Sequence, residues 1–113
     1  MRVLFVCTVN RLRSPTAETL FSTFPGVEAL SAGTDSSATT PLTPELIASV
    51  DVIFAMEKQH RDKIRKRYKV RPADGRIFTL NIPDEYERDD PELIELLKSK
   101  VSLRLEHLVS SES

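Results

Sequence analysis

The sequence of 113 residues predicts an α/β fold, a three-layer sandwich in which a four-stranded parallel sheet lies between two layers of helices. Short apolar runs alternate with amphipathic segments along the chain, which is typical of repeated strand-helix units. Right-handed crossovers between parallel strands place helices on both faces of such a sheet and its first strand near the centre. We expect residues 1–113 to form one domain.

The first half of the chain contains three of the expected strands and two helices. The strands are the apolar runs 2–6, 27–31 and 52–56. A helix is expected over residues 15–24, because its apolar residues fall on one face and Pro25-Gly26 ends it. A short helix should follow Thr43-Pro44, since threonine caps a helix and proline fits its first turn.

The second half should add two helices and the fourth strand. A polar helix is expected over residues 58–67 and a strand over 76–80. The last helix should begin at Pro91, and residues 110–113 should fray. Its core-facing stripe repeats at spacings of three and four residues: Ile94, Leu97, Val101, Leu105 and Leu108.

Charge, hydropathy and cysteine content limit the classes of function. The formal net charge is −1, so bulk charge indicates no partner. We see no apolar stretch long enough to span a membrane and no charged-then-apolar leader, and we therefore expect a cytoplasmic protein without a membrane partner. The single cysteine excludes an internal disulfide and fits a reducing compartment.

The basic stretch from Lys58 to Lys69 has two interpretations. It is either a patch for nucleic acid or another anionic partner, or a solvated helix and loop anchored by Ile64. We favour the solvated helix, because few aromatic residues interrupt the basic ones and the stretch from Asp84 to Glu95 is acidic.

Cys7 directly follows the first expected strand, and Arg13 follows Cys7 at the sixth position. A strand that leads through a loop into a helix directs backbone N–H groups and the positive end of the helix dipole into one concavity. Such a concavity binds phosphate and stabilises a thiolate nucleophile, and an arginine fork can hold two oxygens of the same anion. The spacing alone is a weak pattern. Its place between an apolar strand and a helix start at Ser14-Pro15, where Ser14 can cap the helix, predicts a cysteine phosphatase.

The run from Val3 to Glu18 resembles the opening of the low-molecular-weight protein tyrosine phosphatases, and most closely a short bacterial branch of predicted phosphatases in that superfamily. Later stretches occur in the family's order, so the resemblance covers most of the chain: Ser31-Ala32-Gly33-Thr34, Asp51 to Glu57, and Ile82 to Tyr86. It implies the family's fold, no cofactor or metal, and a phosphorylated protein or small phosphomonoester as substrate.

The resemblance also implies roles for the residues around Cys7. Asn10 would adopt a left-handed backbone conformation and brace the loop, and Ser14 would hydrogen-bond the sulfur. Ser31 would belong to the same supporting network. The remaining loop residues would bind phosphate through their backbone N–H groups: Thr8, Val9, Arg11 and Leu12.

A phosphatase also needs an acid that protonates the leaving oxygen. Asp90-Pro91 matches the family's Asp-Pro, but Asp90 directly precedes a helix and has a sufficient role as its N-cap, which Asp89 can support. Asp84-Glu85-Tyr86 lies over the family's Asp-Pro-Tyr, with glutamate in place of proline. We favour Asp84 as the acid, with Asp90 as the alternative, and Tyr86 is then either a wall of the pocket mouth or a partly exposed loop tyrosine.

Three departures from the family's pattern leave questions open. The segment between Gly33 and Leu46 is short, so it is open whether it forms a substrate wall and which substrate is bound. Val9 replaces a common glycine, which affects the geometry of the loop. Leu12 replaces a second cysteine that protects the nucleophile in many members, so Cys7 should over-oxidise more readily.

Rival functions are compatible with the same motif. They are an arsenate reductase that uses an external thiol, a phosphocysteine carrier, and a non-catalytic module that binds phosphate or nucleic acid. His60 and His107 lie far apart without a cluster of metal ligands, so we expect both to be surface residues of helices.

Overall fold

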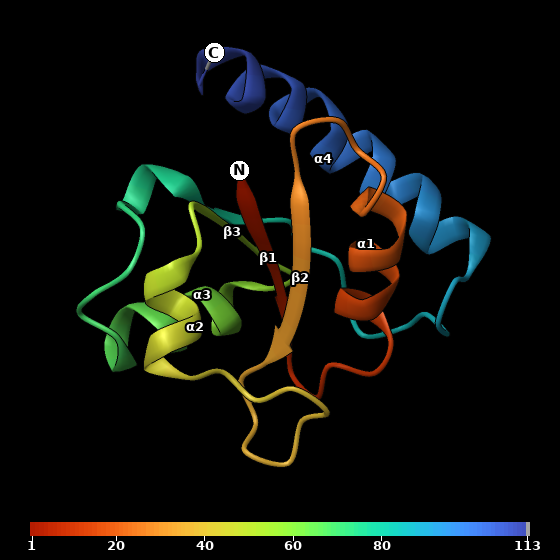
Figure 1. Cartoon of the computed structure of the whole chain (residues 1–113). Coiled ribbons are helices and arrows are strands. Elements are labelled where there is room, and N and C mark those ends of the chain that lie inside the picture. The colour runs from red at the N-terminus through yellow and green to blue at the C-terminus, as the bar shows by residue number, and fades with distance from the viewer. Residues whose placement is uncertain (113) are drawn as a thin grey trace.

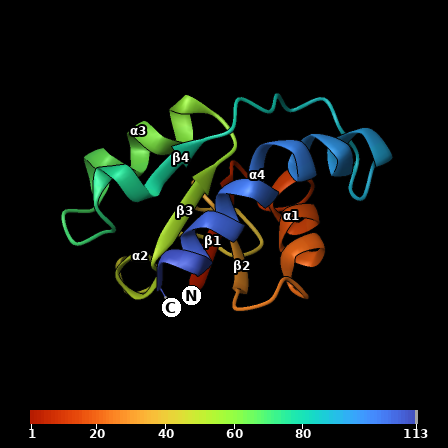
Figure 2. The ribbon, with the colours of Figure 1, turned by 90° about the horizontal axis from the view of Figure 1, so that it is seen from above.

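The structure is a computed structural model that describes residues 1–112. Four parallel strands form one sheet in the order β2-β1-β3-β4: β1 (Arg2–Cys7), β2 (Glu28–Gly33), β3 (Val52–Ala55) and β4 (Ile77–Thr79). One face is covered by α1 (Arg13–Phe21) and α4 (Pro91–Glu112), and the other by α2 (Pro44–Ser49) and α3 (Lys58–Arg67) (Figure 1, Figure 2). The predicted three-layer α/β fold, with β1 inside the sheet, is confirmed.

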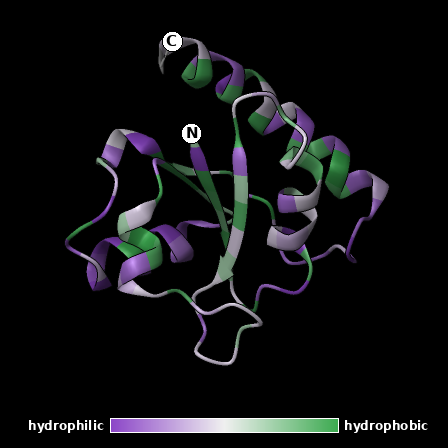
Figure 3. Cartoon of the chain, in the orientation of Figure 1, coloured by the Kyte–Doolittle hydropathy of each residue, from purple (hydrophilic) through white to green (hydrophobic). Residues whose placement is uncertain are grey.

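The core explains why β1 holds this central place. After its first residue the strand is buried, as expected for a parallel strand covered on both faces. Phe5 stacks on Phe21 of α1 and on Phe54 of β3, with ring centroids 5.6 and 5.5 Å apart. On the opposite face, Leu4 and Val6 pack with the apolar side chains of α2 and α3. Figure 3 shows the inner strands as largely hydrophobic and the helices as two-sided.

Several boundaries differ from those expected. α1 begins at Arg13 with Leu12 as its N-cap, so the prediction that Ser14 caps this helix is wrong. β2 runs on to Gly33, which pairs with Cys7. β4 is shorter than expected, because a 3₁₀ turn, η1 (Asp74–Arg76), precedes it.

α4 is longer than expected. The helix continues through Glu112, so the expected fraying of residues 110–112 is wrong, and Ser113 lies outside the described residues. The buried stripe begins at Leu93 rather than Ile94, because Leu93 lies on the face that contacts the sheet. No helix within residues 1–112 combines the length and apolar character that a membrane span requires.

Candidate active site

The loop of residues 8–12 connects the carboxyl end of β1 to α1. The carbonyls of Cys7, Thr8 and Val9 each accept a backbone N–H from the segment 34–39, at 3.0 to 3.1 Å. Because these carbonyls are held by the neighbouring segment, we expect the N–H groups of the loop to turn toward its interior, an arrangement that suits an anion. Within residues 1–112 no N–H group of the loop has a protein acceptor, so the concavity is open to a ligand.

The amino end of α1 adds to this concavity. Its N-cap, Leu12, makes no side-chain bond to the first turn, and Pro15 in that turn has no N–H. The free N–H groups of the turn and the positive end of the helix dipole therefore remain available to an anion.

Cys7 is 2% exposed and its Sγ lies 2.9 Å from Oγ of Ser14. Nδ2 of Asn10 donates to the same Oγ at 2.8 Å, and Asn10 has the left-handed φ of 57° that the sequence predicts. Since Ser14 accepts from Asn10, its own hydroxyl hydrogen can point at the sulfur at 2.9 Å, which is nearer than its other acceptor, the carbonyl of Ala32 at 3.5 Å. This geometry suits a thiolate at Cys7, which accepts hydrogen bonds.

Gly33 lets β2 and the following segment come close to the loop. A Cβ on Gly33 would lie 2.5 Å from the carbonyl oxygen of Thr8 and 2.5 Å from Cβ of Ala38. Either distance is shorter than a van der Waals contact, so only glycine fits here without displacing the loop.

Arg13 is 2% exposed and firmly held. Its NH1 donates to Oε1 of Glu57 at 2.6 Å and to the carbonyl of Ile82 at 2.8 Å. These contacts occupy NH1, and the Nε and NH2 edge of the guanidinium is left for the two oxygens of an anion. The hydrogen bond from Arg13 lowers the pKa of Glu57, so the pair remains charged.

The two candidate acids lie in different environments. Oδ1 of Asp84 is 3.8 Å from Nε of Arg13, and the Asp84 side chain is 66% exposed. Oδ1 of Asp90 accepts the N–H of Glu92 at 2.9 Å, which is the contact of a helix N-cap. The structure therefore brings Asp84, and not Asp90, to the arginine of the site.

Comparisons with known proteins agree with this geometry. No protein-family model matches the chain. The protein-arginine-phosphatase of Bacillus subtilis (strain 168) is 34% identical to it, over 71% of this chain and 70% of that protein. The chain belongs to the low-molecular-weight protein tyrosine phosphatase family.

Two solved structures of this phosphatase family align with nearly the whole chain. One is a cysteine-to-serine mutant of the arginine phosphatase YwlE with a phosphorylated active-site serine (29% identity, TM-score 0.71, 94% of this chain and 96% of that one). The other is the tyrosine phosphatase Wzb from Escherichia coli K30 in complex with phosphate (25% identity, TM-score 0.73, 95% and 97%). The resemblance inferred from the sequence is thereby confirmed.

His60 of this phosphatase-family chain is completely buried, so the prediction that it is a surface residue is wrong. It lies at the start of α3 and forms a reciprocal capping box with Glu57. The spacing of His60 and Ile64 by four residues was the available signal, because it places both on one helix face. His107 is exposed on α4, as predicted.

Ser31 and the side chain of Arg11 lie on the α1 side of the loop. Oγ of Ser31 donates to Oε1 of Glu18 at 2.5 Å, whereas Ser14 faces the carbonyl of Ala32. Ser31 therefore contacts α1 rather than the Cys7–Ser14 pair. Arg11 and Arg88 line a hollow of about 310 Å³ beside the loop, together with Ser31.

Tyr86 lies two residues beyond Asp84 but against α4. It packs on the core and lines a hollow with Pro91 and Leu96. These contacts favour the interpretation of Tyr86 as a partly buried loop residue over a role in the pocket mouth.

The short segment between Gly33 and Leu46 braces the loop of residues 8–12, the candidate phosphate loop. Its backbone bonds hold the loop carbonyls, and NH1 of Arg67 donates to the carbonyl of Thr34 at 2.9 Å. The carbonyl of Val9, which stands in place of the family's common glycine, is one of those held. Among residues 1–112, no group of three or more His, Cys, Asp or Glu is arranged to hold a metal ion.

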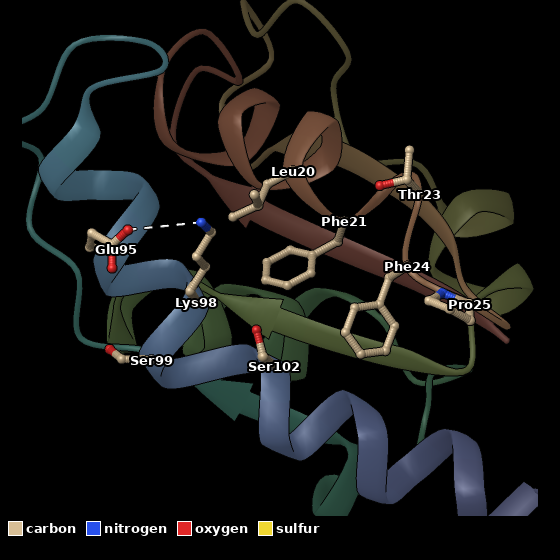
Figure 4. Close-up of a pocket in the computed structure, with 9 residues that line it drawn as sticks. All are labelled: Leu20, Phe21, Thr23, Phe24, Pro25, Glu95, Lys98, Ser99 and Ser102. Carbon is tan, nitrogen blue, oxygen red and sulfur yellow. Dashed lines mark ion pairs between the residues drawn. The ribbon is translucent and has the colours of Figure 1, made fainter.

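An apolar groove of about 620 Å³ lies away from this site, at the carboxyl end of α1 (Figure 4). Phe21 and Phe24 form one wall, and α4 forms the other, with Lys98 paired to Glu95 at 3.8 Å. The phosphate loop adjoins the opposite end of α1, so the groove is not part of the candidate active site.

Proposed function

We propose that this protein is a cysteine-dependent protein tyrosine phosphatase in which Cys7 carries the phosphoryl group. The observation that supports this most strongly is the convergence of three groups. Cys7 Sγ faces a hydroxyl donor, Arg13 is held with one edge free, and the Asp84 carboxylate lies beside that arginine. A nucleophile, an anion clamp and an acid are the parts that two-step phosphoryl transfer requires.

In the first step the Cys7 thiolate attacks phosphorus, and the bond from phosphorus to the leaving oxygen breaks. Asp84 gives its proton to that oxygen, so the phenol leaves neutral. The loop N–H groups and the Nε and NH2 edge of Arg13 hold the other phosphoryl oxygens as charge moves onto them. The product on the enzyme is a phosphocysteine.

In the second step the Asp84 carboxylate takes a proton from water, and the water oxygen attacks phosphorus. The sulfur-phosphorus bond breaks, inorganic phosphate leaves, and the thiolate is restored. The Ser14 hydroxyl, 2.9 Å from the sulfur, stabilises the departing thiolate by donating a hydrogen bond to it.

We infer a phosphotyrosine ester rather than phosphoarginine as the substrate. Arg11, on the loop, is exposed, and neither Arg11 nor Arg88 has a partner among residues 1–112. A phosphorylated guanidinium would bring further positive charge beside these arginines, whereas a phenyl ring would not. Cys7 needs a reduced thiol for this activity, so we place it in the cytoplasm.

Hydrolysis of para-nitrophenyl phosphate by the purified protein tests the activity. Cys7→Ser should abolish turnover but still bind vanadate, and Arg61→Ala on the outer face of α3 should be normal. Phosphotyrosine and phosphoarginine peptides compared on the active enzyme test the substrate.

Other outcomes would select a rival function. Thiol-dependent reduction of arsenate without ester hydrolysis would indicate an arsenate reductase. Transfer of phosphate to a partner protein would indicate a carrier, and binding of phosphate or nucleic acid without any turnover would indicate a binding module.

A further inference from the structure

Thr8, the first residue after the nucleophile, makes a side-chain contact that the mechanism above does not use. Its Oγ1 lies 2.9 Å from Nε2 of His60, which joins the phosphate loop to the first turn of α3. Thr8 is half-buried and His60 is completely buried. A buried imidazole at this place needs partners for both nitrogens, and their identity fixes the direction of the contact.

The other ring nitrogen decides where the hydrogen of His60 lies. Nδ1 accepts the backbone N–H of Glu57 at 3.0 Å, so it carries no hydrogen. A neutral imidazole has one donor and one acceptor nitrogen, and Nε2 must therefore donate to Thr8. Burial, with the positive charge of Arg13, lowers the pKa of His60 to about 4, so the ring is neutral near pH 7.

This arrangement leaves the Thr8 hydroxyl as a donor. Its oxygen accepts from His60, so its single hydrogen must point to another acceptor, and within residues 1–112 no such acceptor contacts it. The backbone of Thr8 lies in the loop: its carbonyl accepts the N–H of Asp35, and its own N–H has no protein acceptor within residues 1–112. The hydroxyl is therefore a donor without a described acceptor, on the residue that directly follows Cys7 in the loop.

We propose that the Thr8 hydroxyl donates a hydrogen bond to an oxygen of the phosphoryl group held in the loop, and that His60 is the positioning residue that turns the hydroxyl toward it. This inference rests on the phosphatase function proposed above. The loss of one hydrogen bond to a charged phosphoryl oxygen should lower the affinity for phosphate, or the rate of hydrolysis, about tenfold.

Four substitutions separate this role from simple bracing of the loop. Thr8→Val removes the hydroxyl at nearly constant shape, and Thr8→Ser keeps it. His60→Gln keeps a donor near the position of Nε2, whereas His60→Asn keeps an acceptor near Nδ1 for Glu57 but loses the donor. His107→Gln on exposed α4 is the matched control.

The measurements are the dissociation constant for inorganic phosphate by calorimetry, kcat and KM for para-nitrophenyl phosphate, and the midpoint of thermal unfolding. We expect Thr8→Val and His60→Asn each to weaken phosphate binding about tenfold, with Thr8→Ser, His60→Gln and His107→Gln near wild type. The Thr8→Val/His60→Asn double variant should be no weaker than either single variant, because both remove the same contact.

The proposal is overturned if Thr8→Val binds phosphate like the wild type and loses only thermal stability, which would be the result of bracing alone. Additive losses in the double variant would overturn the positioning role of His60. A wild type that binds phosphate but hydrolyses no ester would contradict the proposed function, and the phosphate dissociation constants would still decide the role of Thr8.

Discussion

The phosphate loop (residues 8–12) and the acid loop (residues 81–90) meet at Arg13 but are built differently. The phosphate loop is tied along its length by backbone bonds, and Asn10 and Ser14 are buried beneath it. The acid loop is attached near its two ends. The N–H of Ile82 donates to the carbonyl of Met56 at 2.8 Å, and the N–H of Asp89 donates to Oγ1 of Thr16 in α1. The middle of the acid loop is mostly exposed. Cys7 and Arg13 are thus positioned by packing, whereas Asp84, the proposed acid, lies on an exposed segment.

This comparison makes a general prediction about substitutions. Substitutions around the phosphate loop should lower both stability and activity, because the same contacts stabilise the fold and position Cys7 and Arg13. Changes at Asp84 should cost activity alone, because its side chain is exposed and makes no contact with the core.

Arg13→Lys should lower kcat/KM for para-nitrophenyl phosphate by about a thousandfold. A lysine keeps the charge but lacks the fork that can bind Glu57 and an anion at the same time. Arg61→Lys, in which the exposed Arg61–Asp62 pair is altered, is the control and should be normal. A loss of tenfold or less in Arg13→Lys would show that charge alone suffices in the phosphate loop.

Asp84→Ala should lower kcat by about a hundredfold on a poor leaving group such as phenol, and less on para-nitrophenol, which needs little protonation. Its unfolding midpoint in urea should match that of the wild type. Asp90→Ala should instead keep kcat and lose about 1 kcal/mol of stability, as expected for a lost N-cap. The reverse pattern would make Asp90 the acid.

These two substitutions also separate what the sequence could predict from what it could not. The alternation of apolar runs was sufficient to predict the three layers and the central place of β1. The spacing of Cys7 and Arg13, between an apolar strand and a helix start, pointed to the candidate site, whose residue roles stay predictions. Asp84 could be preferred because Asp90 had an alternative role as a cap, and the contacts at both residues favour this choice. As the catalytic acid, Asp84 stays a prediction.

The errors arise where tertiary contacts override local pattern. Ser14 looked like a cap, but its hydroxyl is engaged with Cys7 and Asn10. His60 lies in a highly polar run of the chain, but it is buried and contacts Thr8, a residue distant in sequence. The constraint on Gly33 comes from the close approach of the loop, which the sequence does not show.

Gly33→Ala should lower the free energy of unfolding by about 2 kcal/mol, because its Cβ would force the phosphate loop and Ala38 apart. The rate of hydrolysis should fall with it, since the displaced carbonyl belongs to Thr8. Gly75→Ala is a matched control, because no atom lies within 4 Å of its Cβ. Equal stability of the two variants in urea unfolding would mean that the loop is not rigidly packed.

Acid should weaken the attachment of the phosphate loop through His60. Its pKa is lowered from 6.5 to about 4 in the folded protein, so the unfolded chain binds the proton more readily. The stability that the folded protein gains from a neutral His60 is fully present above pH 6.5 and is lost as the pH falls toward 4. Between about pH 7 and pH 5 we expect a loss of about 2 kcal/mol.

Urea unfolding of His60→Asn at both pH values tests this assignment. The variant should be less stable at neutral pH but should change little between the two, whereas His107→Gln should follow the wild type. The pKa of Glu57 is lowered from 4.5, so its contribution to stability is lost only below pH 5. Glu57 therefore does not cause a loss of stability between pH 7 and pH 5. The same slope in His60→Asn and in the wild type would show that another group causes the loss.

The most direct test is the ultraviolet absorbance of the cysteine thiolate, taken as the difference between the wild type and Cys7→Ser. Because the chain has a single cysteine, this signal reports on Cys7 alone. We expect the thiolate to be present at neutral pH, stabilised by the loop N–H groups and the Ser14 hydroxyl. A thiolate signal that appears only in alkaline buffer, as for an ordinary thiol, would contradict the proposed role of Cys7.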